Sequence, residues 1–221
     1  MWAKNFLSLR DVRLELGKLN VLVGPNAGPC GSAAWSLRPR GHVLVGPNAD
    51  GKSNIVRALE LLKAHARRGP VLEGFEEARR FIFGFEASSR AEVGVETDLA
   101  RGGRASLVLR LGVDGYEEEA LLEDRRLLYH EGSSITFEYA DFGGTAKQRF
   151  TAGELRYYNV GYVRESALSK VPADAHPALA ELANLLKNVI ALSPSPGKLR
   201  EPALLGAEEL GREGEGLAAR L

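Results

Sequence analysis

The sequence VLVGPNADGKSN, residues 43–54, decides the fold, because a short apolar run leads directly into a glycine-bounded loop and then into a helical pattern. Residues 46–53 satisfy G-x-x-x-x-G-K-[ST], the pattern of a loop that wraps phosphate groups. The glycines let the backbone curl so that amide N–H groups point inward, and the following helix adds the positive end of its dipole. The pattern therefore predicts a phosphate-binding loop between a strand and a helix.

The residue types in this loop indicate a nucleoside triphosphate with a magnesium ion. We expect Lys52 to bridge the β- and γ-phosphates and the Ser53 hydroxyl to bind Mg²⁺. The alternative is a turn that only joins a strand to a helix, but a lysine in the first helical turn opposes the helix dipole unless an anion offsets it. No catalytic residue is predicted. The predicted nucleotide-binding residues are Gly46, Pro47, Asn48, Ala49, Asp50, Gly51, Lys52, Ser53 and Asn54, with Ser53 as the metal ligand.

The apolar run and the start of the loop occur twice, as VLVGPNA at residues 21–27 and again at residues 43–49. The first copy has Cys30 where the lysine would stand, and Pro29 removes an amide donor from the loop. A proline and a glycine, at positions 39 and 41, then interrupt any helix. We therefore predict that the first copy binds no phosphate.

The two copies are offset by 22 residues, and removing residues 21–42 leaves a continuous sequence in which a strand pair feeds the loop. We predict that residues 21–42 are an in-frame insertion, created by duplication or by an error in the gene record, that is extruded from the fold. Such an extrusion is tolerable because the entropic cost of closing a loop grows only with the logarithm of its length. The alternative is a second, regulatory site.

Periodicity predicts the elements around the loop. Alternation over residues 5–16 indicates a half-buried strand or a bent pair of strands. The apolar runs at 21–23 and 43–45 indicate strands buried on both faces. Residues 1–20 and 43–66 then form a strand, loop and helix core, since helical spacing of apolar residues follows Gly51.

A different pattern begins at residue 91. Apolar and polar residues alternate to residue 142, which predicts an antiparallel meander within a β-layer at 91–150. We interpret the acidic residues 117–119 as a solvated edge of this layer. Leucines at helical spacing predict a second amphipathic helix within residues 173–192, and the start of another helix follows.

The composition excludes several classes of protein. Lys plus Arg and Asp plus Glu both total 29, so the net charge gives no global attraction to nucleic acid. The single cysteine excludes an intramolecular disulfide, and no apolar run is long enough to span a bilayer. The amino terminus lacks a signal-peptide core, so we expect a cytoplasmic protein without a membrane partner. The histidines lack metal-ligand spacing and are interpreted as surface or loop residues: His42, His65, His130 and His176.

The segments KNFLSLRDVRLELGKLN, residues 4–20, and VLVGPNADGKSNIVRALELL, residues 43–62, resemble the amino-terminal lobe of AAA-type predicted ATPases related to RecF, SMC proteins and the OLD nucleases. The tail, with LSPSPGKLREP and GREGEGLAARL, is similar to the region before the long helical insertion of those proteins. The resemblance implies an α/β fold of the ABC-like P-loop NTPase type, in which a parallel core sheet bearing the P-loop and its helix lies beside the antiparallel meander. It also implies ATP and Mg²⁺ as cofactors, with Asn48 against the γ-phosphate and the attacking water.

The chain departs from this family in two respects. Asp50 stands at the loop tip in place of a small residue, and a carboxylate there weakens triphosphate binding unless it faces solvent. The sequence also contains no LSGGE-like signature and no apolar Walker B strand ending in Asp-Glu. The nearest string, ALLED at residues 120–124, is interpreted as a hairpin edge, and Gln148 is interpreted as part of an ordinary strand edge rather than a Q-loop.

We therefore expect a single ATPase domain over residues 1–221 that is incomplete, being truncated before the second half. It would bind ATP and Mg²⁺ without hydrolysing ATP alone, and the family's mode of action implies a homodimer or a missing second half as partner. The alternative is a non-hydrolytic interaction module or split subunit. DNA binding follows from family analogy alone. The arginine pairs at 67–68, 79–80 and 125–126 are interpreted as solvated.

Overall fold

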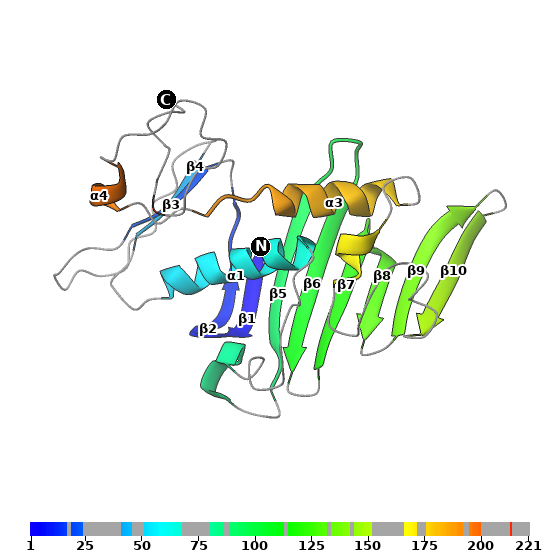
Figure 1. Ribbon diagram of the computed structural model, residues 1–221, viewed down its shortest axis with the longest axis horizontal. Helices are drawn as coiled ribbons and strands as arrows, with labels where there is room; N and C mark the ends of the chain where they lie inside the picture. The colour runs from blue at the N-terminus through cyan, green and yellow to red at the C-terminus, as the bar shows by residue number, and fades with distance from the viewer. Residues whose placement is uncertain are drawn as a thin grey trace. The chain divides into compact units, whose positions relative to one another are not determined.

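The computed structural model describes residues 1–16, 19–23, 41–45, 51–67, 80–85, 89–112, 115–131, 134–141, 144–151, 166–171, 176–191, 195–199 and 213 (Figure 1). The chain divides into two compact units, Met1–Asn188 and Val189–Leu221. In the second unit, the described residues include the short helix α4 (Pro196–Leu199), and the amide of Ser195 donates to the carbonyl of Glu213 at 2.9 Å. All other elements belong to the first unit.

The first unit is built on a sheet of eight strands among the described residues, in which each neighbouring pair is antiparallel. The spatial order is β10-β9-β8-β7-β6-β5-β1-β2. The antiparallel meander expected after residue 91 is therefore confirmed, and the amino-terminal strands extend it. The strands are β1 (Trp2–Phe6), β2 (Leu9–Arg13), β5 (Ala91–Asp98), β6 (Arg104–Gly112), β7 (Gly115–Leu122), β8 (Arg125–Glu131), β9 (Ser134–Asp141) and β10 (Gly144–Thr151).

One face of this sheet is apolar and is covered by two helices, α1 (Lys52–Ala66) and α3 (Pro177–Lys187) (Figure 1). On β6, Leu107 and Leu109 are fully buried, whereas Arg110 points to the opposite face. Burying each leucine stabilises the fold by roughly 1.5–3 kcal/mol. The helices supply their own apolar stripes to the same core, Ile55, Ala58, Leu61 and Leu62 from α1 and Leu179, Leu182, Ala183 and Leu186 from α3.

The segment before the first repeat copy is a bent pair of strands, as predicted. β1 and β2 pair antiparallel around a turn at residues 7–8. Phe6 is fully buried and stacks on Phe81 with ring centroids 5.6 Å apart, next to the short 3₁₀ helix η1 (Phe83–Phe85). This packing ties the turn to the segment that follows α1.

The two copies of the repeat lie side by side. The strands β3 (Leu19–Val23) and β4 (Gly41–Val45) pair in parallel, with Val21 opposite Val43 and Val23 opposite Val45. Equivalent residues of the two copies therefore lie opposite each other in the strand pair. Both ends of the predicted 21–42 insertion lie in these strands, and residues 24–40 lie outside the described residues.

The interpretation of residues 117–119 as a solvated edge is wrong. β7 lies between β6 and β8 inside the sheet, and Glu118 is completely buried while Glu119 is 7% exposed. In contrast, the string at residues 120–124 closes the β7–β8 hairpin as predicted, with Glu123 and Asp124 at positive φ in its turn. Gln148 lies on β10, which ends the sheet.

The packing of Trp2 on Gly94 gives the first testable prediction. These residues are opposite each other on β1 and β5, and a Cβ at position 94 would lie 2.2 Å from the Trp2 ring. Gly94→Ala should therefore lower the free energy of unfolding by about 1–3 kcal/mol through overpacking, measured by urea denaturation. In a Trp2→Ala background the same change should be neutral or stabilising, because the ring is gone and alanine is the better strand residue. An equal cost in both backgrounds would contradict the packing.

Candidate functional site

The described part of the predicted phosphate loop begins at Gly51; Gly46, Pro47, Asn48, Ala49 and Asp50 lie outside the described residues. Gly51 caps α1 in the left-handed conformation, with φ of 81°. A Cβ here would lie 2.8 Å from Leu9 Cδ2 and 2.9 Å from Ser8 Oγ. Both the backbone angle and the β1–β2 turn therefore require glycine at the second glycine of the motif.

The first turn of α1 presents the remaining motif residues. The amides of Asn54 and Ile55 donate to the carbonyl of Gly51 at 2.9 and 3.1 Å, so the helix starts directly at Lys52. Lys52 is half-buried and Ser53 is exposed. No acidic residue stands in this first turn, so no side chain of the turn places a negative charge at the positive end of the helix dipole.

The β1–β2 turn fixes this end of the helix. Asn54 Nδ2 donates to Ser8 Oγ at 2.8 Å, and Arg57 makes a long contact of 3.5 Å with Asn54 Oδ1. Asn54 thus has a structural partner in addition to its predicted place in the nucleotide site. The amide, ammonium and hydroxyl groups of residues 51–53 form a donor set that suits phosphate oxygens and, through Ser53, a magnesium ion.

Comparison with known proteins gives a family. Residues 42–187, more than half of the chain, match the family model described as "AAA domain, putative AbiEii toxin, Type IV TA system". The chain belongs to this AAA domain family. The matched region of the AAA domain begins at His42, so it includes the second copy of the repeat and α1 and leaves out the first copy. No curated protein and no solved structure matches the chain.

The AAA domain assignment supports a P-loop NTPase with a nucleotide ligand. It does not separate the RecF, SMC and OLD relatives from other members of the class. In the part of the chain that the structure describes, no helix is long and apolar enough to cross a membrane.

Sequence reasoning missed a buried polar cluster behind α1. Glu118 on β7 is completely buried on the apolar face of the sheet, and its Oε1 lies 2.8 Å from Nε2 of His65, in the last turn of α1. Its Oε2 lies 3.6 Å from Nδ1 of His130 on β8. The amides of Ala167 and Leu168 each donate to this carboxylate at 2.8 Å.

The cluster corrects the interpretation of the histidines. His65 and His130 were expected at the surface, but they are 0% and 1% exposed because the carboxylate of Glu118 gives each a charged neighbour inside the core. His176 is half-buried, and burial lowers its pKa; His42 is outside the residues whose side chains are described. Within the described residues, no group of three or more His, Cys, Asp and Glu side chains could hold a metal ion.

The pKa of Glu118 lies well below its ordinary value of 4.5. Burial alone would raise it, but the imidazoles of His65, at 2.8 Å, and His130, at 3.6 Å, lower it further than burial raises it. The two backbone donors act in the same direction, since they bind the ionised form. Glu118 is therefore an anion held inside the core.

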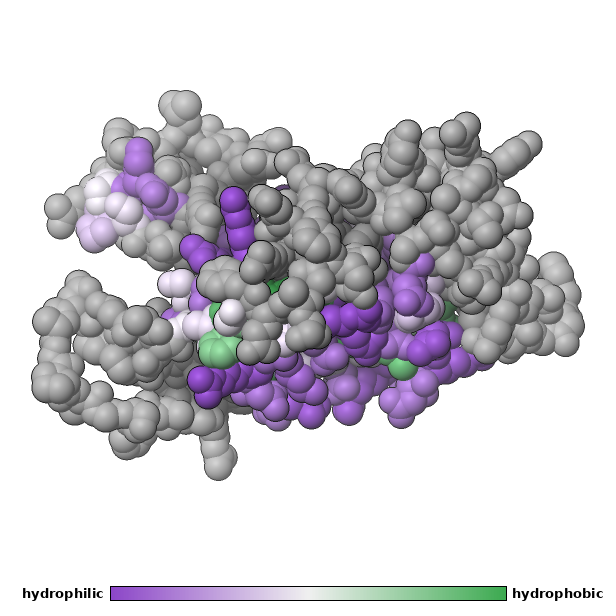
Figure 2. Space-filling model, turned by 90° about the horizontal axis from the view of Figure 1, so that it is seen from below, coloured by the Kyte–Doolittle hydropathy of each residue, from purple (hydrophilic) through white to green (hydrophobic). Residues whose placement is uncertain are grey.

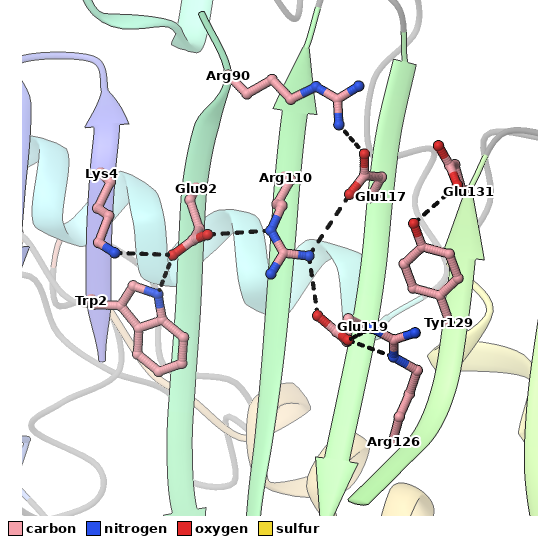
Figure 3. A network of polar contacts seen from close by, with 10 residues as sticks. All are labelled: Trp2, Lys4, Arg90, Glu92, Arg110, Glu117, Glu119, Arg126, Tyr129 and Glu131. Atoms are coloured by element: carbon pink, nitrogen blue, oxygen red, sulfur yellow. Dashed lines mark hydrogen bonds and ion pairs between the residues drawn. The ribbon is translucent and has the colours of Figure 1, made fainter. Parts of the chain in front are cut away.

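The opposite face of the sheet carries a ladder of charged residues (Figure 3). Arg110 lies at its centre, 3.2 Å from Glu92 and 3.1 Å from Glu119. Arg126 pairs with Glu119 at 2.5 Å and stacks on the Tyr129 ring at 4.7 Å. In the space-filling view hydrophilic residues dominate the described surface (Figure 2). Because acids and bases alternate and pair with one another, the described side chains of this face offer little net positive charge to a nucleic acid.

Gly51 gives a prediction with an internal control. Gly51→Ala should cost about 1–3 kcal/mol for the positive φ and more for the clash with Leu9 and Ser8. Gly102→Ala should cost only the strain of a positive φ, because φ is 90° at Gly102 and nothing lies within 4 Å of an added Cβ. Urea denaturation should therefore show the larger loss for Gly51→Ala, and equal losses would contradict the crowding at the start of α1.

Glu118 gives a prediction about pH. Its folded pKa is lowered, so the stability it contributes is complete above about pH 4.5 and is lost as the pH falls below that value. The free energy of unfolding of the parent chain should therefore fall more steeply between about pH 5 and pH 3 than that of Glu118→Gln. At pH 7, Glu118→Gln should cost about 3–5 kcal/mol, because a buried pair is broken.

The matched control is Glu117→Gln on the same strand. Glu117 faces the other side of the sheet and pairs with Arg90 and Arg110. Its substitution should cost less than that of Glu118, because its partners Arg90 and Arg110 are partly exposed to solvent. Urea midpoints measured from pH 7 to pH 3 compare all three proteins, and parallel curves for the parent and Glu118→Gln would contradict the buried anion.

Proposed function

We propose that the chain is the ATP- and Mg²⁺-binding part of a RecF/SMC-like AAA ATPase. The observation that carries the proposal is the start of α1, where a left-handed Gly51 leads directly into Lys52 and Ser53 in a first turn without acidic residues. The backbone of residues 46–51 would wrap the phosphates, Lys52 would contact the β- and γ-phosphates, and Ser53 would bind Mg²⁺. Bound Mg²⁺ would neutralise charge on the phosphates.

The RecF/SMC-like assignment draws its support from two features. The residues on both sides of the repeat resemble that branch, and an antiparallel β-layer is present, although α1 packs on that layer rather than on a parallel core sheet as the resemblance implies. The family match over residues 42–187 supports the coarser class of AAA domain. DNA as a ligand remains a proposal by analogy, and the pairing of Arg126 with Glu119 gives it no support.

Hydrolysis needs groups that these 221 residues do not contain. The sequence lacks an LSGGE-like signature and an apolar strand ending in Asp-Glu, and the acidic pair at residues 123–124 lies in a hairpin turn. We propose that a second half supplies these groups, because a second copy of the same residues would lack them too. Alone, the chain would bind ATP and release it unchanged.

The binding proposal is tested by titrating a fluorescent ATP analogue in the presence of Mg²⁺. Lys52→Ala should weaken binding about 10- to 100-fold, because a charge-assisted hydrogen bond to phosphate is worth about 1.5–3 kcal/mol. Lys63→Ala, in the last turn of the same helix, should bind like the parent. Equal affinity for the parent and Lys52→Ala would reject the ATP site and favour the alternative function, a non-hydrolytic interaction module.

A further inference from the structure

Glu118 joins three separate parts of the first unit. Its side chain meets His65 from α1 and His130 from β8, and it accepts the two backbone amides at positions 167 and 168. Ser166 Oγ lies 3.4 Å from the same carboxylate and accepts the amide of Ser169 at 3.1 Å. Residues 166–168 lead into the 3₁₀ helix η3 (Leu168–Lys170), which packs against both α1 and α3.

The burial of this carboxylate makes its contacts hard to separate. An ionised group without solvent is tolerated only while its hydrogen-bond partners remain in place. Moving residues 166–168 away would remove two backbone donors, and moving α1 away would remove His65. The end of α1, the strand β7 and residues 166–168 should therefore move together or not at all.

The same helix carries the proposed nucleotide site at its other end. Lys52 opens α1 and His65 lies in its last turn, a separation of about 20 Å at 1.5 Å per residue. Near Lys52, the helix is held by the contact of Asn54 with Ser8 and by the close approach of Gly51 to the β1–β2 turn. Near its carboxyl end it is held by Glu118. These two attachments hold the two ends of the helix, in addition to the apolar packing of its middle.

We propose that Glu118 is a positioning residue for the nucleotide site, and that it couples phosphate binding at Lys52 to the order of residues 166–168. The proposal rests on the proposed function, because it assumes that the start of α1 binds a nucleotide. The carboxylate fixes α1 so that Lys52 and Ser53 meet the phosphates. By reciprocity, nucleotide binding that fixes α1 must strengthen the contacts of Glu118.

The test compares the parent with Glu118→Gln, which has nearly the same shape without the charge, and with Glu117→Gln as the matched control. Urea denaturation first confirms that each protein is folded at the temperature used. Titration with a fluorescent ATP analogue and Mg²⁺ then gives the dissociation constants. We expect about a tenfold weaker affinity for Glu118→Gln, within the range typical of coupled sites, and parent affinity for Glu117→Gln.

Hydrogen exchange supplies a readout that a merely structural role would not move. In the parent, Mg²⁺ and ATP should slow exchange of the amides of Ala167 and Leu168 by a larger factor than exchange of the amides of the core strand β6. Binding stabilises the whole fold, but only the first two amides donate to Glu118. In Glu118→Gln they should exchange fast with or without nucleotide. The parent measurement needs no variant, so it decides the question even where Glu118→Gln fails to fold.

The outcomes separate this inference from the proposed function. A parent chain that does not bind the ATP analogue overturns both. A parent chain that binds the ATP analogue, together with weaker binding by Lys52→Ala, supports the nucleotide site. The coupling is overturned, and the nucleotide site stands, if folded Glu118→Gln binds with parent affinity. The same conclusion follows if nucleotide leaves the exchange of the two amides unchanged in the parent. Weakened binding together with nucleotide-dependent protection of Ala167 and Leu168 supports the coupling.

Discussion

The structure depends on covering one apolar face of an antiparallel sheet with α1, the helix that follows the predicted phosphate loop. Ile55 and Leu62 of α1 belong to the same core as the buried leucines of β6. Because a helix is stiff over its length, this packing also determines where Lys52 and Ser53 lie at its exposed start. The chemistry of the site and the stability of the core are therefore two properties of one helix.

Periodicity in the sequence predicted α1 and the antiparallel strands, because both signals are local. The pairing of β1 with β5 could not be predicted in this way, since Trp2 and Gly94 are distant in sequence and neither residue specifies the other. The phosphate-loop pattern likewise predicted that the backbone curls at Gly51. It could not show that Ser8 and Leu9 close off the space beside that glycine, which only the tertiary structure provides.

The buried anion was partly predictable. The acidic residues 117–119 read as one solvated run by composition, but a strand period of two places Glu118 on the opposite face from its neighbours. The register confirms this division, since Glu118 lies opposite Leu109, and Glu117 lies opposite Arg110. Alternation alone would have placed Glu118 among apolar residues. Its partners come from α1 and from residues 166–168, and no local pattern could have identified them.

The two copies of the repeat pair with one another, and the length of chain between them permits this. Two parallel strands need a connection of about a dozen residues or more to bring the chain back to the same end of the sheet. The offset of the copies leaves residues 24–40 between β3 and β4, which is long enough for that return. A duplication much shorter than this would have allowed only an antiparallel hairpin, in which identical sequences run in opposite directions and do not meet in register. The length of the duplicated unit, rather than its composition, therefore permits the two copies to lie residue against residue.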